Sequence, residues 1–201
     1  MKGLLLVSDG IDSPVAGYVM KKQIQVDAIH FVNRINENKI KKIKSLLNKI
    51  KIKKLFVVEF EAIQKEIALN CNRKYQCVLC KRFMIRVAEQ IAKKNKYTFL
   101  ITGDNLAQVA SQTLDNMAVI SLATKMPILR PLLCNDKQET IDLARKIGTY
   151  GISIKDSSSC AFVPNNPVTK SKLDYVLNEE ERLDVNKLVE EAIKTLRIFD
   201  L

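Results

Sequence analysis

Two groups of residues in this 201-residue chain have types and spacings suited to chemistry. The first is the run SDGIDS at residues 8–13, which follows a short apolar segment and precedes Pro14. The backbone N–H groups at a helix N-terminus carry partial positive charge, Gly10 permits close approach, and Ser8 and Ser13 add hydroxyl donors. Asp12 would hold Mg²⁺ beside a triphosphate. The run indicates a phosphate-binding loop, and the alternative is a plain helix start with Asp12 or Ser13 as its N-cap.

The second group is formed by cysteines. Cys77 and Cys80 form a CxxC pair, and Cys160 lies in a predicted loop. Three thiolates suit an iron–sulfur cluster with one iron left open, whereas structural zinc normally takes four protein ligands. A persulfide or disulfide relay and unreactive structural thiols are the alternatives. His30 is the only histidine, and we expect neither a histidine-based catalytic triad nor a multi-histidine metal site.

The elements that must position these residues alternate between strand and helix. Apolar runs predict strands, and apolar residues at helical spacing predict the helices between them. We expect strands at 3–8, 26–32, 55–60, 97–102 and 127–133, and helices at 14–22, 40–50, 62–69, 81–94, 106–116, 136–147 and 183–196. This alternation predicts an α/β fold with a doubly wound, Rossmann-like parallel sheet, whose ligands bind where the strand order reverses.

The order of the motifs is that of a known family. The segment SDGIDSPVAGYVM at residues 8–20 resembles the SGGxDS loop of the PP-loop ATP pyrophosphatases. More narrowly, it is similar to the ATP domain of the ThiI family of tRNA 4-thiouridine synthases. The resemblance continues in KRFMIRVAEQIA, TGDNLAQVASQTLDN, PILRPL, DKQETIDLARKIGTY and NPVTKSK, at 81–92, 102–116, 127–132, 136–150 and 166–172.

This resemblance implies an ATP site with Mg²⁺. The residues that match nucleotide-contacting positions are Leu6, Val7, Ser8, Gly10, Asp12, Ser13, His30, Phe31, Lys81, Gly103 and Gln112. Among them Lys81 is expected to neutralise the α-phosphate, and Asp12 and Cys160 join it as catalytic residues. The second loop position is glycine in the family and Asp9 here. A carboxylate about 4 Å from a phosphate charge would cost ~4 kcal/mol at an effective dielectric constant of 20.

The implied reaction is ATP-dependent thiolation of a tRNA uridine. ATP would adenylate the uridine oxygen, and sulfur would then displace AMP. Some family members hold a [4Fe-4S] or [3Fe-4S] cluster on a CxxC pair and a later cysteine, matching Cys77, Cys80 and Cys160, whereas bacterial relatives carry sulfur on the later cysteine. The alternatives are a sulfur-carrier or iron–sulfur protein with a weakened nucleotide loop, and an enzyme of the same fold acting on another RNA position or a small molecule.

Composition and length bear on organisation and partners. We expect a single PP-loop domain over 1–201, with an active-site loop at 155–172 and a C-terminal helical extension at 173–201.

The net charge of +11 favours a polyanionic partner, and residues 34–54 hold nine basic side chains and one acidic one. The family's THUMP module is not seen in these residues, so we expect weak tRNA binding alone, with a THUMP-containing partner or a homodimer adding specificity. The apolar runs are too short for a membrane span or a signal peptide, which predicts a cytoplasmic protein without a membrane partner.

Overall fold

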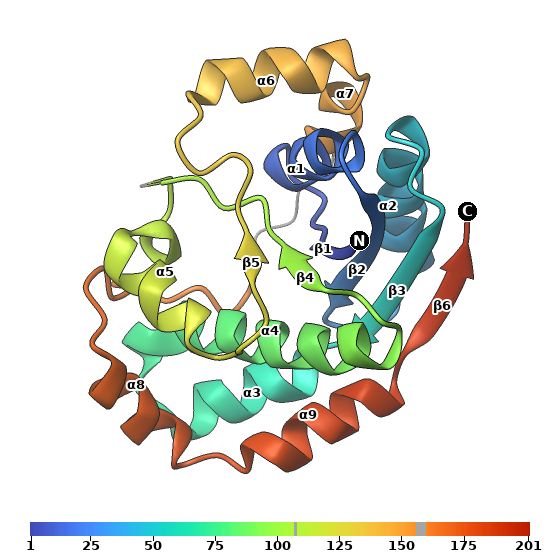
Figure 1. Cartoon of the computed structure of the whole chain (residues 1–201). Coiled ribbons are helices and arrows are strands. Elements are labelled where there is room, and N and C mark those ends of the chain that lie inside the picture. Colours follow the sequence, from blue (N-terminus) through green and yellow to red (C-terminus); the bar gives the residue numbers. More distant parts are fainter. Residues whose placement is uncertain (107, 156–159) are drawn as a thin grey trace.

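The computed structural model describes residues 1–106, 108–155 and 160–201 and shows one six-stranded sheet between two layers of helices (Figure 1). The strands are β1 (Lys2–Leu6), β2 (Gln25–Val32), β3 (Lys54–Glu59), β4 (Phe99–Ile101), β5 (Ile128–Leu129) and β6 (Arg197–Asp200). Their order across the sheet is β5-β4-β1-β2-β3-β6, and β6 alone of these is antiparallel to its neighbour. The strand order therefore reverses between β1 and β4, as a doubly wound fold requires.

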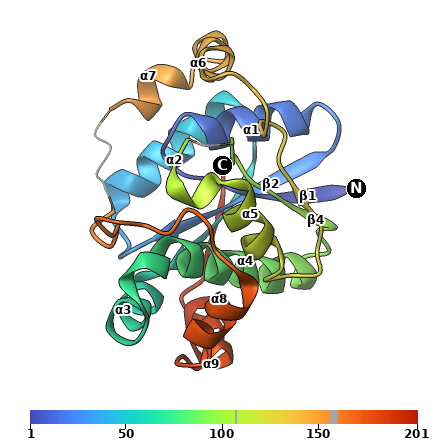
Figure 2. The ribbon, with the colours of Figure 1, turned by 90° about the vertical axis from the view of Figure 1, so that its left-hand side faces the viewer.

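Four helices cover one face of the sheet (Figures 1 and 2). They are α1 (Asp12–Lys21), α2 (Glu37–Lys49), α6 (Lys137–Lys146) and α7 (Tyr150–Ser153). Helix α2 buries Ile40, Ile43, Leu46 and Leu47, because apolar residues at this spacing share one side of a helix. Its first N–H groups are capped by the side chain of Asn36.

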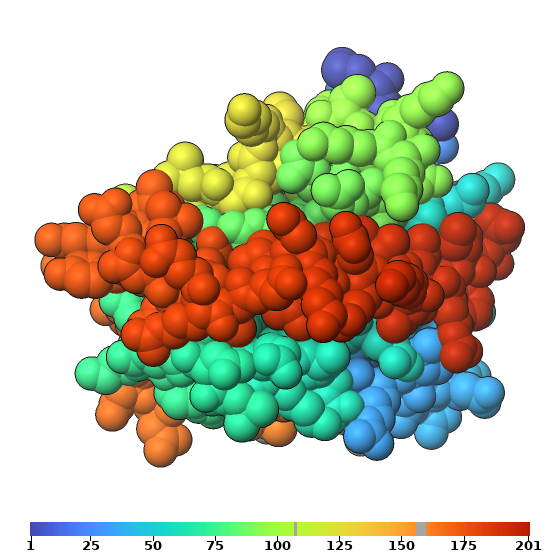
Figure 3. Space-filling model, turned by 90° about the horizontal axis from the view of Figure 1, so that it is seen from below, coloured from blue at the N-terminus to red at the C-terminus, as the bar shows by residue number. Residues whose placement is uncertain are grey.

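The opposite face is covered by α3 (Glu61–Asn70), α4 (Gln76–Lys94), α5 (Leu114–Ser121), α8 (Leu173–Glu180) and α9 (Val185–Lys194). The C-terminal segment forms a continuous orange-to-red band across this side of the molecule, between α3 and the end of α4 (Figure 3). Glu180 fastens α8 to α4, because its carboxylate accepts hydrogen bonds from both Arg82 and Arg86. Burial opposes the charged form of Glu180, yet the two guanidinium groups hold its pKa below the ordinary value.

The structure corrects three sequence-based element predictions. The helix expected at 106–116 is wrong: residue 107 lies outside the described residues, Ala110–Gln112 forms a 3₁₀ turn, and α5 begins only at Leu114. The buried Asn116 side chain explains the change, since it donates hydrogen bonds to the carbonyls of Ala110 and Val168. Helix α4 begins five residues earlier than expected, at Gln76. The segment 173–201 is not purely helical, because it ends in β6.

Two further predictions concern loops and membranes. Residues 160–172 are irregular, as expected for the 155–172 loop, and its residues 156–159 lie outside the described part of the chain. Within the described residues, the helices are too short or too polar to cross a lipid bilayer.

Candidate nucleotide and thiol site

One cavity of about 340 Å³ opens at the carboxyl ends of β1, β2 and β4, where the strand order reverses. All eleven residues predicted for the nucleotide site line it: Leu6, Val7, Ser8, Gly10, Asp12, Ser13, His30, Phe31, Lys81, Gly103 and Gln112. The wall is completed by Met84, Ile85, Thr102, Asp104, Val109 and Ile120. The fold therefore brings together residues that are more than 100 positions apart in the sequence.

The loop between β1 and α1 is closed by its two serines. Ser8 N–H donates to Ser13 Oγ at 2.8 Å, and Ser13 Oγ lies 3.2 Å from the Ser8 carbonyl, to which it donates. Helix α1 begins at Asp12, and in the described part of the chain no side chain caps it. The interpretation of Asp12 or Ser13 as a plain N-cap is therefore wrong. The first turn of α1 lies at the cavity wall with its partial positive charge available to an anion.

Gly103 lets β4 approach the start of α1. A Cβ atom at this position would lie 2.6 Å from Ser13 N and 2.9 Å from the Asp12 carbonyl carbon. Because both neighbours are backbone atoms, no side-chain rotation can relieve the overlap. At Gly10 a Cβ atom would meet only Ser8 Oγ, at 3.5 Å, so the protein itself leaves room there. Gly103 is thus required by packing, whereas the space beside Gly10 stays open toward the cavity.

A buried ionic network holds Lys81 at the cavity wall. Lys81 Nζ donates to Asp104 Oδ1 at 2.8 Å, while Asp104 Oδ2 accepts from Thr102 Oγ1 at 2.8 Å and Arg130 Nε at 3.3 Å. Burial disfavours the charged carboxylate, but Lys81, Thr102 and Arg130 together keep the pKa of Asp104 below its ordinary value. Sequence reasoning missed Asp104 and Arg130, although both stand inside the motif blocks that carried the resemblance. Buried Gln112 Oε1 has no hydrogen-bond partner within the described residues.

Asp12 is paired with a lysine that sequence reasoning also missed. Lys137 Nζ lies 2.8 Å from Asp12 Oδ1 and 3.1 Å from Oδ2, and also donates to Gln108 Oε1. Lys137 opens α6, so this contact joins the nucleotide loop to a segment 125 residues further along the chain. Carboxylate oxygens such as those of Asp12 are of the kind that binds Mg²⁺. In this structure the positively charged group beside them is the Lys137 ammonium.

His30 and Phe31 lie at the end of β2 and form the opposite wall. His30 Nδ1 donates to the Val7 carbonyl at 2.8 Å, because a carbonyl oxygen can only accept. Burial lowers the pKa of His30 below its ordinary value, against the opposing effects of that hydrogen bond and of Asp9, so the ring is neutral at pH 7. The histidine therefore ties the end of β2 to the Val7 carbonyl, just after β1.

Asp9 does not line the nucleotide cavity. Its carboxylate is directed to α2, where Lys42 Nζ lies 3.4 Å from Asp9 Oδ2. The expected charge penalty at the phosphate position is therefore reduced by an adjacent cation. Asp9 also has an ordinary backbone conformation, because its φ is not positive. Asp9 therefore needs no backbone conformation that is reserved for glycine.

The predicted thiols gather at the start of α4. Cys77 and Cys80 lie in its first turns, and Gln76 Nε2 donates to Cys80 Sγ at 3.3 Å. Gln64 Nε2 donates to Cys160 Sγ at 3.5 Å. Burial raises the pKa of Cys80 to about 12 and also raises that of Cys77, to which a charge on nearby Cys160 contributes. These two thiols are therefore protonated at neutral pH.

The thiols do not form a ready metal site. Across residues 1–106, 108–155 and 160–201, no group of three or more His, Cys, Asp or Glu side chains is placed to hold a metal ion. Cys71 is also directed elsewhere, since its Sγ donates to the Glu179 carbonyl at 3.3 Å and burial raises its pKa to about 11. An iron–sulfur cluster on Cys77, Cys80 and Cys160 therefore stays a prediction.

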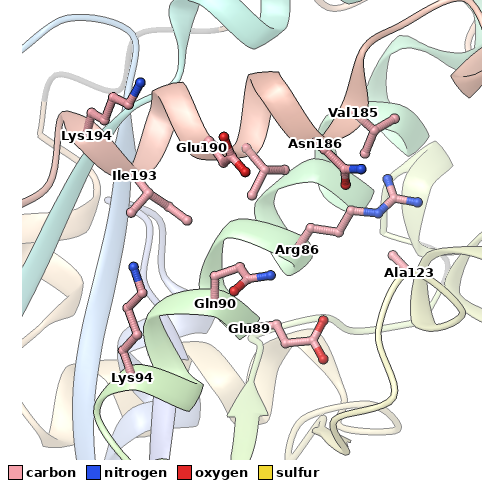
Figure 4. A pocket seen from close by; sticks show the side chains of 11 residues that line it. Arg86, Glu89, Gln90, Lys94, Ala123, Val185, Asn186, Glu190, Ile193 and Lys194 are labelled. Atoms are coloured by element: carbon pink, nitrogen blue, oxygen red, sulfur yellow. The ribbon is translucent and has the colours of Figure 1, made fainter.

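A smaller cavity joins Cys160 to the nucleotide loop. Its volume is about 180 Å³, and its wall includes Cys160 together with Ser8, His30 and Phe31, which also line the nucleotide cavity. The exposed Cys160 thiol thus lies on the far side of a shared wall from the predicted ATP site. A larger cavity of about 620 Å³ between α4 and α9 contains none of the predicted site residues (Figure 4).

The basic segment 34–54 is less available than the sequence suggested. Lys42 is paired with Asp9, and Lys44 Nζ lies 4.0 Å from the centre of the Phe199 ring. Lys39 and Lys41 are exposed on the same helix. An RNA contact in this region therefore has to use the exposed lysines rather than the whole run.

The fold and the site together indicate the class of protein to which this chain belongs. A mostly parallel α/β sheet with a Ser/Gly/Asp loop and an uncapped helix at its switch point is typical of the adenine-nucleotide domains of the PP-loop class. The chain belongs to the ThiI family, described as "Thiamine biosynthesis protein (ThiI)", which matches residues 1–185.

Relatives and solved structures agree with this assignment. The chain is 46% identical to a "Probable tRNA sulfurtransferase" of Halothermothrix orenii, covering 100% of this chain and 53% of that protein. It is 41% identical to the protein of the same name from Finegoldia magna, and the match covers 100% of this chain and 54% of that protein. The chain thus spans about half the length of the curated relatives it matches.

Among solved structures, a 4-thiouridine synthetase in complex with RNA and bound ATP superposes with a TM-score of 0.93 at 35% identity, over 98% of this chain and 54% of that chain. An NH3-dependent NAD synthetase from Campylobacter jejuni has a TM-score of 0.59 at 15% identity and covers 96% of this chain and 83% of its own, which shows a shared fold alone.

Proposed function

We propose that this chain is an ATP-dependent tRNA sulfurtransferase of the 4-thiouridine type. The observation that carries the proposal is that one cavity collects all eleven predicted nucleotide residues while Cys160 lies in an adjoining cavity with three of them in common. The names of the relatives and the ATP-bound and RNA-bound neighbour support the same activity.

The ATP phosphates would bind at the first turn of α1. Its uncapped N–H groups and the Ser8 and Ser13 hydroxyls supply donors, and Lys81 supplies a positive charge to the α-phosphate. Leu6, His30 and Phe31 would flank the adenine. When Mg²⁺ is bound it neutralises phosphate charge, and the Asp12 carboxylate would hold it once Lys137 turns away.

The chemical step would be adenylation followed by sulfur transfer. The uridine C4 oxygen attacks the α-phosphorus, pyrophosphate leaves, and the oxygen becomes part of a good leaving group. The terminal sulfur of a persulfide on Cys160 then bonds to C4 as the C4–O bond breaks and AMP departs. Cys77 Sγ, whose thiol proton passes to solvent, then attacks the Cys160 sulfur, which releases 4-thiouridine and leaves a Cys77–Cys160 disulfide. An external persulfide donor reloads the enzyme after a dithiol reductant has reduced that disulfide.

An iron–sulfur cluster on Cys77, Cys80 and Cys160 is the competing proposal for the sulfur source. Only the sequence pattern supports it, because the described side chains are not placed as a set of metal ligands. Residues 156–159 precede Cys160 and lie outside the described part of the chain. Iron and sulfide analysis of anaerobically purified protein separates the two proposals, and no step here depends on the cluster.

Sulfur incorporation into tRNA tests the proposed function. Unmodified tRNA is incubated with the protein, Mg-ATP, a persulfide donor and a dithiol, and the digested nucleosides are measured by mass spectrometry. We expect 4-thiouridine that requires ATP and is lost in Cys160→Ser, whereas Cys134→Ser serves as the exposed-thiol control and retains it. A thiolated nucleoside other than 4-thiouridine would favour a different RNA position, and ATP binding without any thiolated nucleoside would favour a small-molecule substrate. Absence of both would favour a sulfur carrier.

A further inference from the structure

We propose that Lys42 is a positioning residue for the nucleotide loop: it holds the Asp9 carboxylate outside the ATP cavity and neutralises its charge. This inference rests on the proposed function and deepens it. It concerns a pair of residues, 33 positions apart, that meets only in the folded protein.

The contact geometry supports this role. Lys42 Nζ lies 3.4 Å from Asp9 Oδ2, and the Lys42 side chain is 14% exposed while that of Asp9 is 39% exposed. The same ammonium donates to the carbonyl oxygens of Ser153, at 3.2 Å, and Lys155. Ser153 in turn donates from its hydroxyl to the Gly10 carbonyl at 3.1 Å. Asp9 and Gly10 are therefore both fastened to the end of α7.

The position of Lys42 in the fold explains why its charge would act on the phosphates through Asp9 and not by direct contact. It lies on α2, whose apolar side is buried against the sheet, and the cavity wall contains Gly10 and Asp12 but neither Asp9 nor Lys42. Removing Lys42 would leave an unpaired carboxylate next to a site for three phosphates and would also release the carbonyls that fix α7. An ammonium that touched the phosphates directly would instead line the cavity.

Charge compensation predicts a specific pattern of affinities. Lys42→Met should weaken Mg-ATP binding about tenfold, which corresponds to ~1.4 kcal/mol, because the Asp9 charge then repels the phosphates. Asp9→Asn removes that charge and should bind ATP at least as tightly as the wild type. The double variant should bind like Asp9→Asn. Lys41→Met is the matched control, since it removes an exposed charge from the same helix and should leave ATP affinity within about twofold.

The experiment is calorimetric titration of the four variants and the wild type with Mg-ATP and with adenosine. Adenosine carries no phosphate, so its affinity should not change in Lys42→Met, whereas a merely structural defect would weaken both ligands. A double variant as weak as Lys42→Met would overturn the proposal, because Lys42 would then act on ATP without Asp9. Equal ATP affinities in wild type and Lys42→Met would also overturn it. No ATP binding by the wild type would instead contradict the proposed function.

Discussion

Replacing Gly103 by alanine tests the close approach of β4 to the nucleotide loop. The added Cβ atom would lie 2.6 Å from Ser13 N and 2.7 Å from Ser13 Cα, so the two backbone segments must separate by several tenths of an ångström. Overpacking of this kind costs about 1–3 kcal/mol. For a chain of 201 residues this lowers the melting temperature by roughly 2–12 °C. Because Ser13 belongs to the loop itself, ATP affinity should also fall, by about tenfold or more.

Two other glycines provide the controls for Gly103→Ala. At Gly151 nothing lies within 4 Å of an added Cβ atom, so Gly151→Ala should leave ATP binding unchanged and raise stability by up to ~1 kcal/mol. At Gly10 the methyl group would meet only Ser8 Oγ, so Gly10→Ala should stay within about 0.5 kcal/mol of wild type and still weaken ATP. Thermal unfolding without ligand and titration with Mg-ATP measure both effects. If Gly103→Ala melts and binds ATP like wild type, the packing explanation is wrong.

Four further predictions concern stability, pH, sulfur and RNA. Glu180→Ala should destabilise the protein by about 3–5 kcal/mol in urea unfolding, because it leaves the buried Arg82 and the partly buried Arg86 without their carboxylate partner; unchanged stability would contradict this. The folded-state pKa of Asp104 is depressed, so its contribution to stability is present above its ordinary pKa near 3.8 and is lost as pH falls through the lower folded value. Asp104→Asn should therefore flatten the loss of thermal stability below about pH 4, and an unchanged acid profile would exclude this origin. After one turnover without reductant, peptide mapping should find Cys77 joined to Cys160, whereas stoichiometric iron in anaerobic protein would favour the cluster. Lys41→Glu should weaken tRNA binding and reduce the magnitude of its salt slope by about one in filter binding, and an unchanged slope would remove this helix from the RNA contact.

Local patterns in the sequence predicted strands where β1 to β5 lie and a phosphate-binding loop after the first of them, whereas the rest of the cavity wall was predicted from the resemblance to the ThiI family. The apolar run before SDGIDS predicted a buried strand delivering a loop to the sheet edge, and β1 ends at Leu6 as that interpretation requires. The same loop residues line the cavity. These predictions held because strand periodicity and helix starts depend on neighbouring residues.

The features that sequence reasoning missed depend on distant contacts. The pairs Asp9–Lys42 and Asp12–Lys137 join residues 33 and 125 positions apart, and nothing local indicates either. The strand β6 is a four-residue segment that becomes a strand only by pairing with β3. The helix expected at 106–116 does not form as predicted, because the Asn116 side chain donates tertiary hydrogen bonds to the carbonyls of Ala110 and Val168.

The stoichiometry of ATP consumption tests the central claim most directly. With unmodified tRNA, a persulfide donor and a dithiol present, AMP, pyrophosphate and 4-thiouridine are counted in the same reaction. Adenylation of the base predicts one AMP and one pyrophosphate for each thiolated uridine, and little AMP without tRNA. Release of ADP and phosphate, or thiolated uridine formed without ATP, would contradict the assignment of this cavity to adenylation.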